Sequence, residues 1–202
     1  MTDPVYALLH RLQRDLESLP GCDLRITTVA ASAKVAERLE EALGRKPPRG
    51  LVALYQLWDG GKLGEGVKLL DLDTASARCR ELVRGNGLKG LWPFLERGGR
   101  LIALDAEAAW DAEGEWPVVE IFDRTVDRVG TTLLRFLSVL ATELRMGASS
   151  PGELPALYEE RSLRDPGFAE HWVDLADIQE RFGKGPASQR TLELGMRAAT
   201  PP

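Results

Sequence analysis

The sequence predicts an α+β fold, in which a twisted, mostly antiparallel sheet is flanked by helices and followed by an α-helical C-terminal extension. Three observations predict it. Short β-rich runs and amphipathic helical patterns are mixed, without the regular strand-helix-strand order of a parallel sheet. A long apolar stripe at residues 131–146 predicts a closing helix after the last of these runs. Beyond a small-residue linker at 147–152, the pattern is helical to the end of the chain.

Residues 1–30 are expected to form a helix and a strand. Apolar residues recur at helical spacing along residues 5–16 and stop before Pro20-Gly21. The run DLRITTV, residues 23–29, is rich in β-branched residues and predicts a strand. Ser32 is then expected to cap a second helix, which ends at Gly44.

Residues 31–146 are expected to form the main α+β domain. A short helix over LVALYQLW, residues 51–58, should end in a turn at Asp59-Gly60-Gly61. Three neighbouring strands are predicted at residues 67–72, 100–105 and 118–123. A helix between the first two should have Asp73 or Thr74 as its cap.

Residues 147–202 are expected to form a helical tail that resembles a degenerate tetratricopeptide repeat. From Ala169 onward, large and small residues stand close to the positions at which the repeat has them. These residues are Trp172, Leu175, Ala176, Gly183, Ser188, Leu192 and Gly195. Solenoids need about three units to bury their faces. We therefore expect Trp172, Leu175 and Leu192 to be buried. The tail either packs as a stabilising hairpin or binds a peptide.

Composition excludes several classes of protein. The 202 residues are 44% hydrophobic and 28% charged, and no apolar run reaches the roughly 20 residues that cross a bilayer. The net charge of −5 argues against direct binding to nucleic-acid phosphates. The first residues lack the basic end and unbroken apolar segment of a signal peptide, so a cytoplasmic location is expected. Cys22 and Cys79 are far apart and predict buried thiols.

No motif in the chain predicts an enzyme, a metal site or a cofactor. The two histidines, His10 and His171, are distant in sequence, and neither adjoins a nucleophile motif. The glycine-rich GGKLGEG lacks the Lys-Ser/Thr pair of a phosphate-binding loop. The segment DAEGEW has its glycine too early for a calcium loop.

Negative charge is concentrated between Leu101 and Asp127. This segment carries a net −7, whereas the rest of the chain sums to +2. One interpretation is a solvated hairpin loop. The other is an acidic docking surface for a basic protein, because charge complementarity speeds encounter and aromatic residues anchor interfaces. The candidate partner-binding residues are Asp105, Glu107, Trp110, Asp111, Glu113 and Glu115, and Trp116 would strengthen the surface.

A set of motif residues carries a family resemblance. In EEALGRKPPRGLVALYQLWDGG and the later block LWPFLERGGRLIALD they are Leu43, Gly44, Pro48, Tyr55, Trp58, Asp59, Gly60, Gly61, Trp92, Pro93 and Asp105. In order and type they resemble the signature of the SUKH superfamily, in its branch of Smi/Knr cell-wall regulators and bacterial immunity proteins. Asp59 stands where asparagine is more usual. The resemblance covers about residues 31–146.

The resemblance implies an α+β domain without enzymatic activity. Many bacterial members are immunity proteins, which bind and neutralise a toxin, often a nuclease or a nucleic-acid deaminase. An acidic segment fits such a role, because it can imitate the charge of a nucleic acid and cover a basic cleft. The alternative is a scaffold or regulatory module whose tail recruits a peptide.

Overall fold

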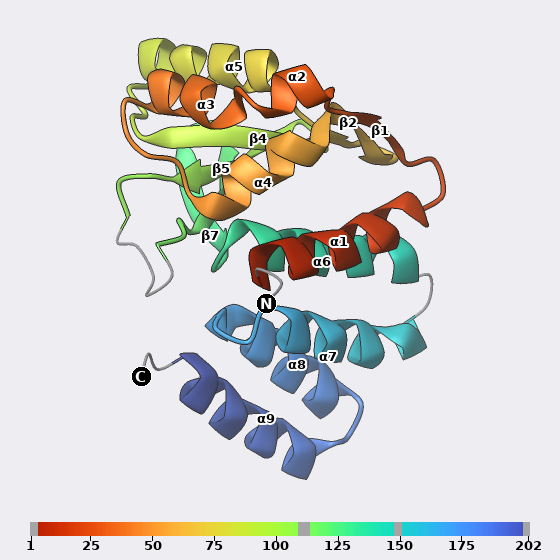
Figure 1. The fold of residues 1–202 in the computed structure, drawn as a ribbon. Helices are drawn as coiled ribbons and strands as arrows, with labels where there is room; N and C mark the ends of the chain where they lie inside the picture. The colour runs from red at the N-terminus through yellow and green to blue at the C-terminus, as the bar shows by residue number, and fades with distance from the viewer. Residues whose placement is uncertain (1–3, 109–113, 148–150, 200–202) are drawn as a thin grey trace. The chain divides into compact units, whose positions relative to one another are not determined.

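The computed structural model describes residues 4–108, 114–147 and 151–199 and confirms the α+β class. Its centre is one seven-stranded antiparallel sheet with the order β1-β2-β3-β4-β5-β6-β7 (Figure 1). Each strand therefore pairs with its neighbour in sequence. The strands are β1 (Asp23–Ile26), β2 (Trp58–Gly64), β3 (Val67–Leu69), β4 (Leu91–Arg97), β5 (Arg100–Asp105), β6 (Val118–Phe122) and β7 (Thr125–Gly130).

Helices precede, interrupt and follow the strands. They are α1 (Pro4–Glu17), α2 (Val29–Ser32), α3 (Val35–Leu43), α4 (Arg49–Leu57), α5 (Leu72–Asn86), α6 (Leu133–Met146), α7 (Leu154–Arg164), α8 (Ala169–Arg181) and α9 (Gly185–Ala199), with a 3-10 turn at Pro151–Glu153. The predicted stop of α3 is confirmed, because Gly44 takes the left-handed conformation at φ 67° and its N–H donates to Glu40 O.

Two predicted helix starts are wrong. Ser32 ends the short α2, and Lys34 takes the N-cap position of α3 without a side-chain hydrogen bond. At α5 the cap is Asp71, not Asp73 or Thr74, because its side chain accepts from the Thr74 N–H. An aspartate before the first turn is the common arrangement, whereas Asp73 lies inside the helix.

The predicted turn at Asp59-Gly60-Gly61 is also wrong, because these residues continue into β2. Gly60 and Gly61 have φ of 76° and 128° and form part of the irregular pairing with β1. A Cβ on Gly61 would lie 2.3 Å from Asp23 O. The glycines thus let two backbones approach closely, which is their other common use besides a turn.

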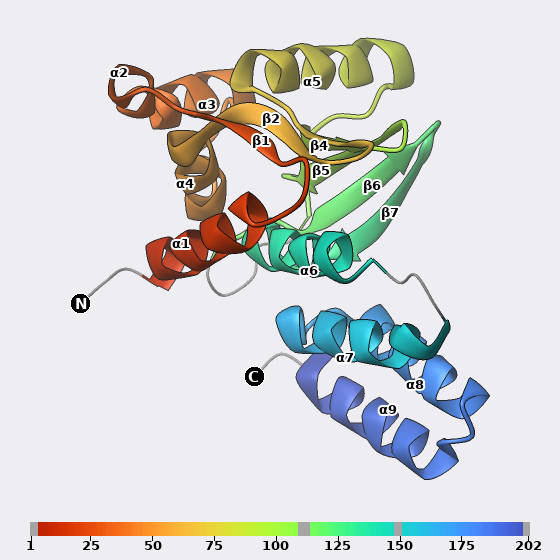
Figure 2. The ribbon, with the colours of Figure 1, turned by 90° about the vertical axis from the view of Figure 1, so that its right-hand side faces the viewer.

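Helices cover both faces of the sheet. On one face Leu82 and Leu88, at the end of α5, pack on Ala103, Val119 and Ile121. On the opposite side α1 packs against α4 (Figure 2). The largest fully buried side chains are apolar or aromatic and include Trp58, Trp92, Trp116, Tyr55 and Phe94. Most of the tryptophans therefore stabilise the core.

The chain divides into two compact units, Met1–Leu134 and Arg135–Pro202. The sequence placed a boundary at residue 147, after the closing helix, whereas the units divide near the start of α6. Nearly all of α6 thus belongs to the second unit.

The second unit is wholly helical. Arg161 of α7 contacts Glu143 of α6 at 3.2 Å between Nε and Oε1. Helices α8 and α9 pack so closely that a Cβ on Gly195 would lie 2.5 Å from the Cβ of Trp172. Leu175 is buried as predicted, whereas Trp172 is only partly buried. Leu192 is 40% exposed, so its predicted burial is wrong. The contact of α9 with α8 is made by Gly195 and by Thr191, whose hydroxyl donates to Gln179 Oε1 at 2.8 Å.

Candidate functional site

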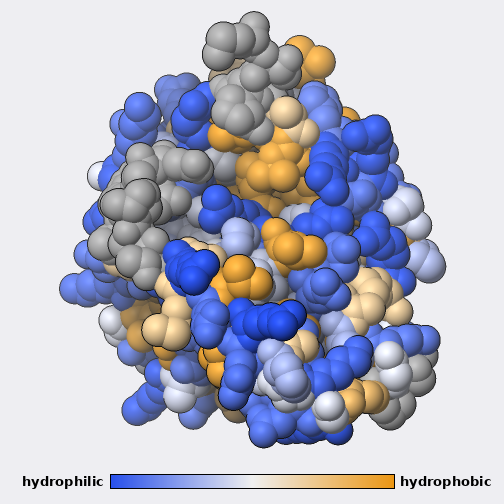
Figure 3. Space-filling view, turned by 90° about the horizontal axis from the view of Figure 1, so that it is seen from below, coloured by the Kyte–Doolittle hydropathy of each residue, from blue (hydrophilic) through white to orange (hydrophobic). Residues whose placement is uncertain are grey.

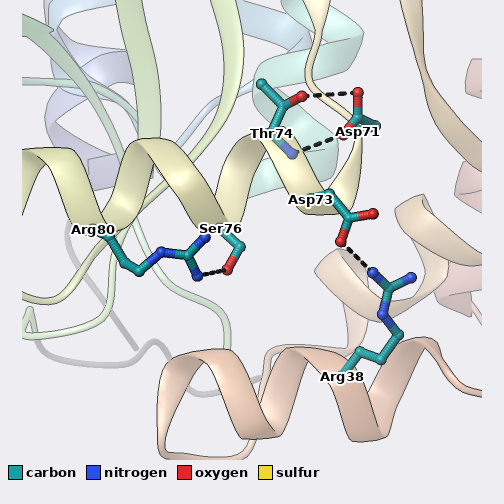
Figure 4. Close-up of polar contacts among 6 residues, drawn as sticks. All are labelled: Arg38, Asp71, Asp73, Thr74, Ser76 and Arg80. Atoms are coloured by element: carbon teal, nitrogen blue, oxygen red, sulfur yellow. Dashed lines mark hydrogen bonds and ion pairs between the residues drawn. The ribbon is translucent and has the colours of Figure 1, made fainter.

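A groove between α3 and α5 is the candidate functional site of the first unit. Its volume is about 390 Å³. The α3–α5 groove is lined by Arg38, Glu41, Ala42, Leu72, Asp73, Ser76, Cys79 and Arg80. Figure 4 shows the side chains of Arg38 and Asp73 pointing toward each other from the two helices. The lining therefore carries charges of both signs beside the apolar Ala42 and Leu72.

The polar contacts of the groove are those of an accessible surface. Arg38 and Asp73 form an ion pair whose side chains are 43% and 86% exposed. Arg80 donates from Nη1 to the Ser76 hydroxyl at 2.9 Å (Figure 4). Exposed pairs of this kind stabilise a fold by only about 0–1 kcal/mol. A partner can therefore exchange these contacts for its own at little cost.

The start of α5, which positions the groove, is held by Asp71. Its carboxylate accepts from the Thr74 N–H at 2.7 Å, from the Thr74 hydroxyl at 2.9 Å and from Arg25 at 3.2 Å. Burial by itself would raise the pKa of Asp71, but these hydrogen bonds and the charge of Arg25 together lower it. The carboxylate is therefore stabilised in its ionised form, in which it caps the helix.

Cys79 is the thiol in the groove, and it is not activated. Burial raises the pKa of Cys79, and the neighbouring Arg80 only partly opposes that rise. Since the thiolate is the nucleophilic form, a raised pKa leaves little of it at neutral pH. The groove thus has the character of a binding surface more than of a nucleophilic centre.

Two of the predicted partner-binding residues lie together at the end of β5. Asp105 accepts at Oδ1 from the N–H groups of Glu107 and Ala108, at 2.9 and 3.2 Å. Glu107 is exposed and forms a 2.8 Å ion pair with Arg45, which also donates to Ala106 O. This turn therefore lies beside the end of α3, and part of its negative charge is neutralised.

Other residues of the predicted acidic surface do not form it. Glu115 is 8% exposed and accepts from the Gly50 N–H at 2.9 Å, so it serves the start of α4 inside the protein. Trp116 is fully buried. The prediction that Glu115 and Trp116 face a partner is wrong. Trp110, Asp111 and Glu113 lie outside the described residues.

The rest of the acidic run is spread along the sheet. Glu120 pairs with Arg100 at 2.7 Å, and Asp127 lies opposite Glu120 on β7. Asp123 is in the β6–β7 turn, whereas Asp105 ends β5 at the opposite end of the strand pair. Charges that are adjacent in sequence are therefore divided among several surfaces.

The residues of the family signature have structural roles. Leu43 and Gly44 end α3, and Pro48 is the N-cap of α4. Tyr55, Trp58, Trp92 and Pro93 are buried in α4, β2 and β4, whereas Asp59 is exposed beside Gly60 and Gly61 in β2. Asp105 forms the turn after β5. Because these signature residues shape the fold, we expect a binding surface to be formed by exposed residues near them.

Sequence reasoning missed Arg38, Ser76 and Arg80 as site residues. The spacing of Ser76 and Arg80 places them on one face of α5. No signal in the sequence places that face near α3, because α4, β2 and β3 lie between the two helices in sequence.

Within the described ranges, no three His, Cys, Asp or Glu side chains group in a way that could hold a metal ion. No helix in the same ranges has the length and apolar character to cross a membrane. No protein-family model matches this chain, and none of the curated proteins matches it.

Proposed function

We propose that this chain is a non-enzymatic binding protein that neutralises a toxin domain, as an immunity protein of the SUKH type. The observation that carries the proposal is the α3–α5 groove. Two helices hold charged side chains there, in exposed contacts that a protein surface can replace. The partner we propose is a basic domain of the nuclease or deaminase type.

The charge of the chain supports a basic partner. Its net charge is −5, and a charge of opposite sign on the toxin would speed their encounter. Glu107, held by Arg45 just beyond the end of α3, is a further exposed acidic side chain of the first unit. The resemblance of residues 31–146 supports the more specific immunity role.

Coexpression tests the proposal. A toxin domain encoded next to this chain in its native genome should stop the growth of a host, and this chain should restore growth. The Glu41→Lys/Asp73→Lys variant should fail to restore growth, because the reversed charges would repel the basic docking surface of the partner.

Glu81→Lys is the matched control, since Glu81 lies on α5 outside the groove lining and pairs with Arg78. It should restore growth as the wild type does. The absence of both rescue and a complex with the wild type would refute the immunity role. Rescue by the Glu41→Lys/Asp73→Lys variant would refute the groove as its docking surface.

A scaffold or regulatory function is the second proposal, and the exposed side chains of α9 favour it. Leu192, Leu194 and Met196 are 40%, 52% and 73% exposed. On the surface seen from below, apolar side chains lie in several small clusters, with hydrophilic side chains between them (Figure 3). This function would be supported by a partner protein that no longer binds the Leu192→Ser/Met196→Ser variant but still binds the groove variant.

A further inference from the structure

Strand β1 forms one edge of the sheet and is exposed along most of its length. Within the described residues it pairs with β2 alone. Asp23 and Arg25 are exposed, and Ile26 is 65% exposed. An open edge of this kind is a template for another strand.

The backbone groups of Leu24 face the open edge. The hypothetical Cβ of Gly61 on β2 would lie 2.3 Å from Asp23 O and 3.1 Å from Arg25 N, so these two groups face β2. Alternate residues of an antiparallel strand bond to opposite sides. The Leu24 N–H is accordingly beside the thiol of Cys22, a weak acceptor, instead of β2.

The bulge in this strand pair does not disturb β1 itself. Leu24 and Ile26 are two residues apart, but their partners Gly61 and Trp58 are three apart, which places the extra residue on β2. Asp23 and Arg25 therefore share one face of a regular strand, and Leu24 and Ile26 share the other.

We propose that β1 pairs antiparallel with β1 of a second copy of this chain, about a twofold axis that passes between the two Leu24 residues. In this register each Leu24 N–H donates to the other's carbonyl. Asp23 faces the partner's Arg25 and Arg25 faces the partner's Asp23, in the closely spaced pairs of an antiparallel ladder. Asp23 and Arg25 are thus each opposite a residue of the other charge in the second copy.

The other edge strand lacks this property. If β7 paired with itself about Asp127 or about Arg128, the central pair would be two like charges. The charge pattern of β1 therefore favours a second copy as its occupant and one register. Because β1 has only four residues, its edge buries less than the about 1,200 Å² of a standard interface, and we expect a weak dimer.

A charge swap tests the register. Sedimentation velocity of the full chain over a concentration series should show a monomer–dimer equilibrium. Asp23→Arg or Arg25→Asp alone should weaken the dimer about tenfold or more, because each creates two like-charge pairs. The double variant Asp23→Arg/Arg25→Asp should restore the affinity of the wild type.

Asp71→Asn is the control for Arg25, which also bonds to Asp71 inside the subunit. It keeps a helix cap and should not weaken the dimer. A wild type that stays monomeric at every concentration, or single variants that associate as the wild type does, would overturn the proposal.

A disulfide gives a second measurement that does not depend on charge. In a Cys22→Ser/Cys79→Ser background, Leu24→Cys should cross-link two chains, because a hydrogen-bonded pair has its Cα atoms about 5.5 Å apart, within disulfide range. Val29→Cys is the control, since Val29 is 89% exposed but lies outside the strand. Equal cross-linking of both variants would contradict the register.

Discussion

His171 is a buried histidine whose surroundings oppose its protonated form. It is 2% exposed, and its ring meets that of Phe168 edge-on at 4.8 Å. Burial, and then the charge of Arg161, lower the pKa of His171 to about 4. Arg161 remains in place because it pairs with Glu143 and lies over the ring of Tyr158.

The lowered pKa of His171 predicts a loss of stability in mild acid. An unfolded histidine binds its proton near pH 6.5, and the folded one only near pH 4, so the unfolded state takes up more protons between these values. The free energy of unfolding should fall as the pH drops through this window, by at most about 3 kcal/mol.

Urea denaturation of the wild type and of His171→Gln at several pH values measures this loss. For each protein, the free energy of unfolding is plotted against pH. The difference between the slopes of the two plots isolates the contribution of His171 from that of Asp174, whose pKa is raised by burial. If the wild type and His171→Gln lose stability in parallel as the pH falls, His171 has the same pKa in the folded and unfolded states, and the prediction is wrong.

Gly61 is the glycine where we expect the largest cost of a methyl group. Gly61→Ala would combine a φ of 128° with a Cβ 2.3 Å from Asp23 O and 2.8 Å from the Leu24 Cα. It should destabilise the protein by about 3 kcal/mol or more and separate β1 from β2. Gly66→Ala is the control, because its φ of 68° has open space around it and it should cost only about 1 kcal/mol. Thermal melts compare the two, and equal shifts would contradict the close approach.

At the scale of the element, the cap of α5 determines how firmly one wall of the groove is held. Asp71 accepts three hydrogen bonds there, one of them from Arg25 on β1. The cap thus links a helix to an edge strand that is distant in sequence.

Asp71→Ala should lower the free energy of unfolding by about 1 kcal/mol, because the first turn of α5 loses its acceptor. Asp71→Asn should cost less, since asparagine also caps helices but lacks the charge that pairs with Arg25. Chemical denaturation of both variants measures the difference. If alanine and asparagine are equally destabilising, the ion pair and not the cap holds the helix.

At the scale of the whole molecule, the net charge of −5 matters more than any acidic segment. Glu107 pairs with Arg45, Glu120 with Arg100, and Glu115 is buried, so the run between Leu101 and Asp127 is not a single acidic patch. Long-range attraction of a basic partner would therefore come from the summed field.

Association with the proposed toxin should accordingly slow as salt is raised, because screening shortens the range of the field. Glu107→Lys should slow association at low salt and change the dissociation rate little. Its unfolding free energy should shift by less than about 1 kcal/mol, since the pair with Arg45 is exposed. Stopped-flow or surface-based kinetics at two salt concentrations test this. An association rate indifferent to salt would exclude electrostatic steering.

Local chemistry alone determined the class of the fold and several of its parts. The spacing of apolar residues predicted α1, α6 and the α+β mixture, and Gly44 predicted the end of α3, because a helical stripe or a left-handed cap depends only on nearby residues. The strands at β1, β3, β5 and β6 were predicted for the same reason, from β-branched and apolar runs bounded by turn residues. The prediction that the last three are neighbours is wrong for β3 and β5, because β4, which was not predicted, pairs between them.

Tertiary structure decided the rest. β2 contains Gly60 and Gly61 in a place where local propensity favours a turn, and it is a strand because β1 and β3 pair with both of its sides. From the sequence Glu115 is expected on the surface. In the folded chain it is buried, because it accepts a hydrogen bond from the Gly50 N–H at the start of α4. The α3–α5 groove exists only because the fold brings together side chains of two helices that α4, β2 and β3 separate in sequence. A side chain's exposure and partners depend on residues far away in sequence, and that information is absent from any local pattern.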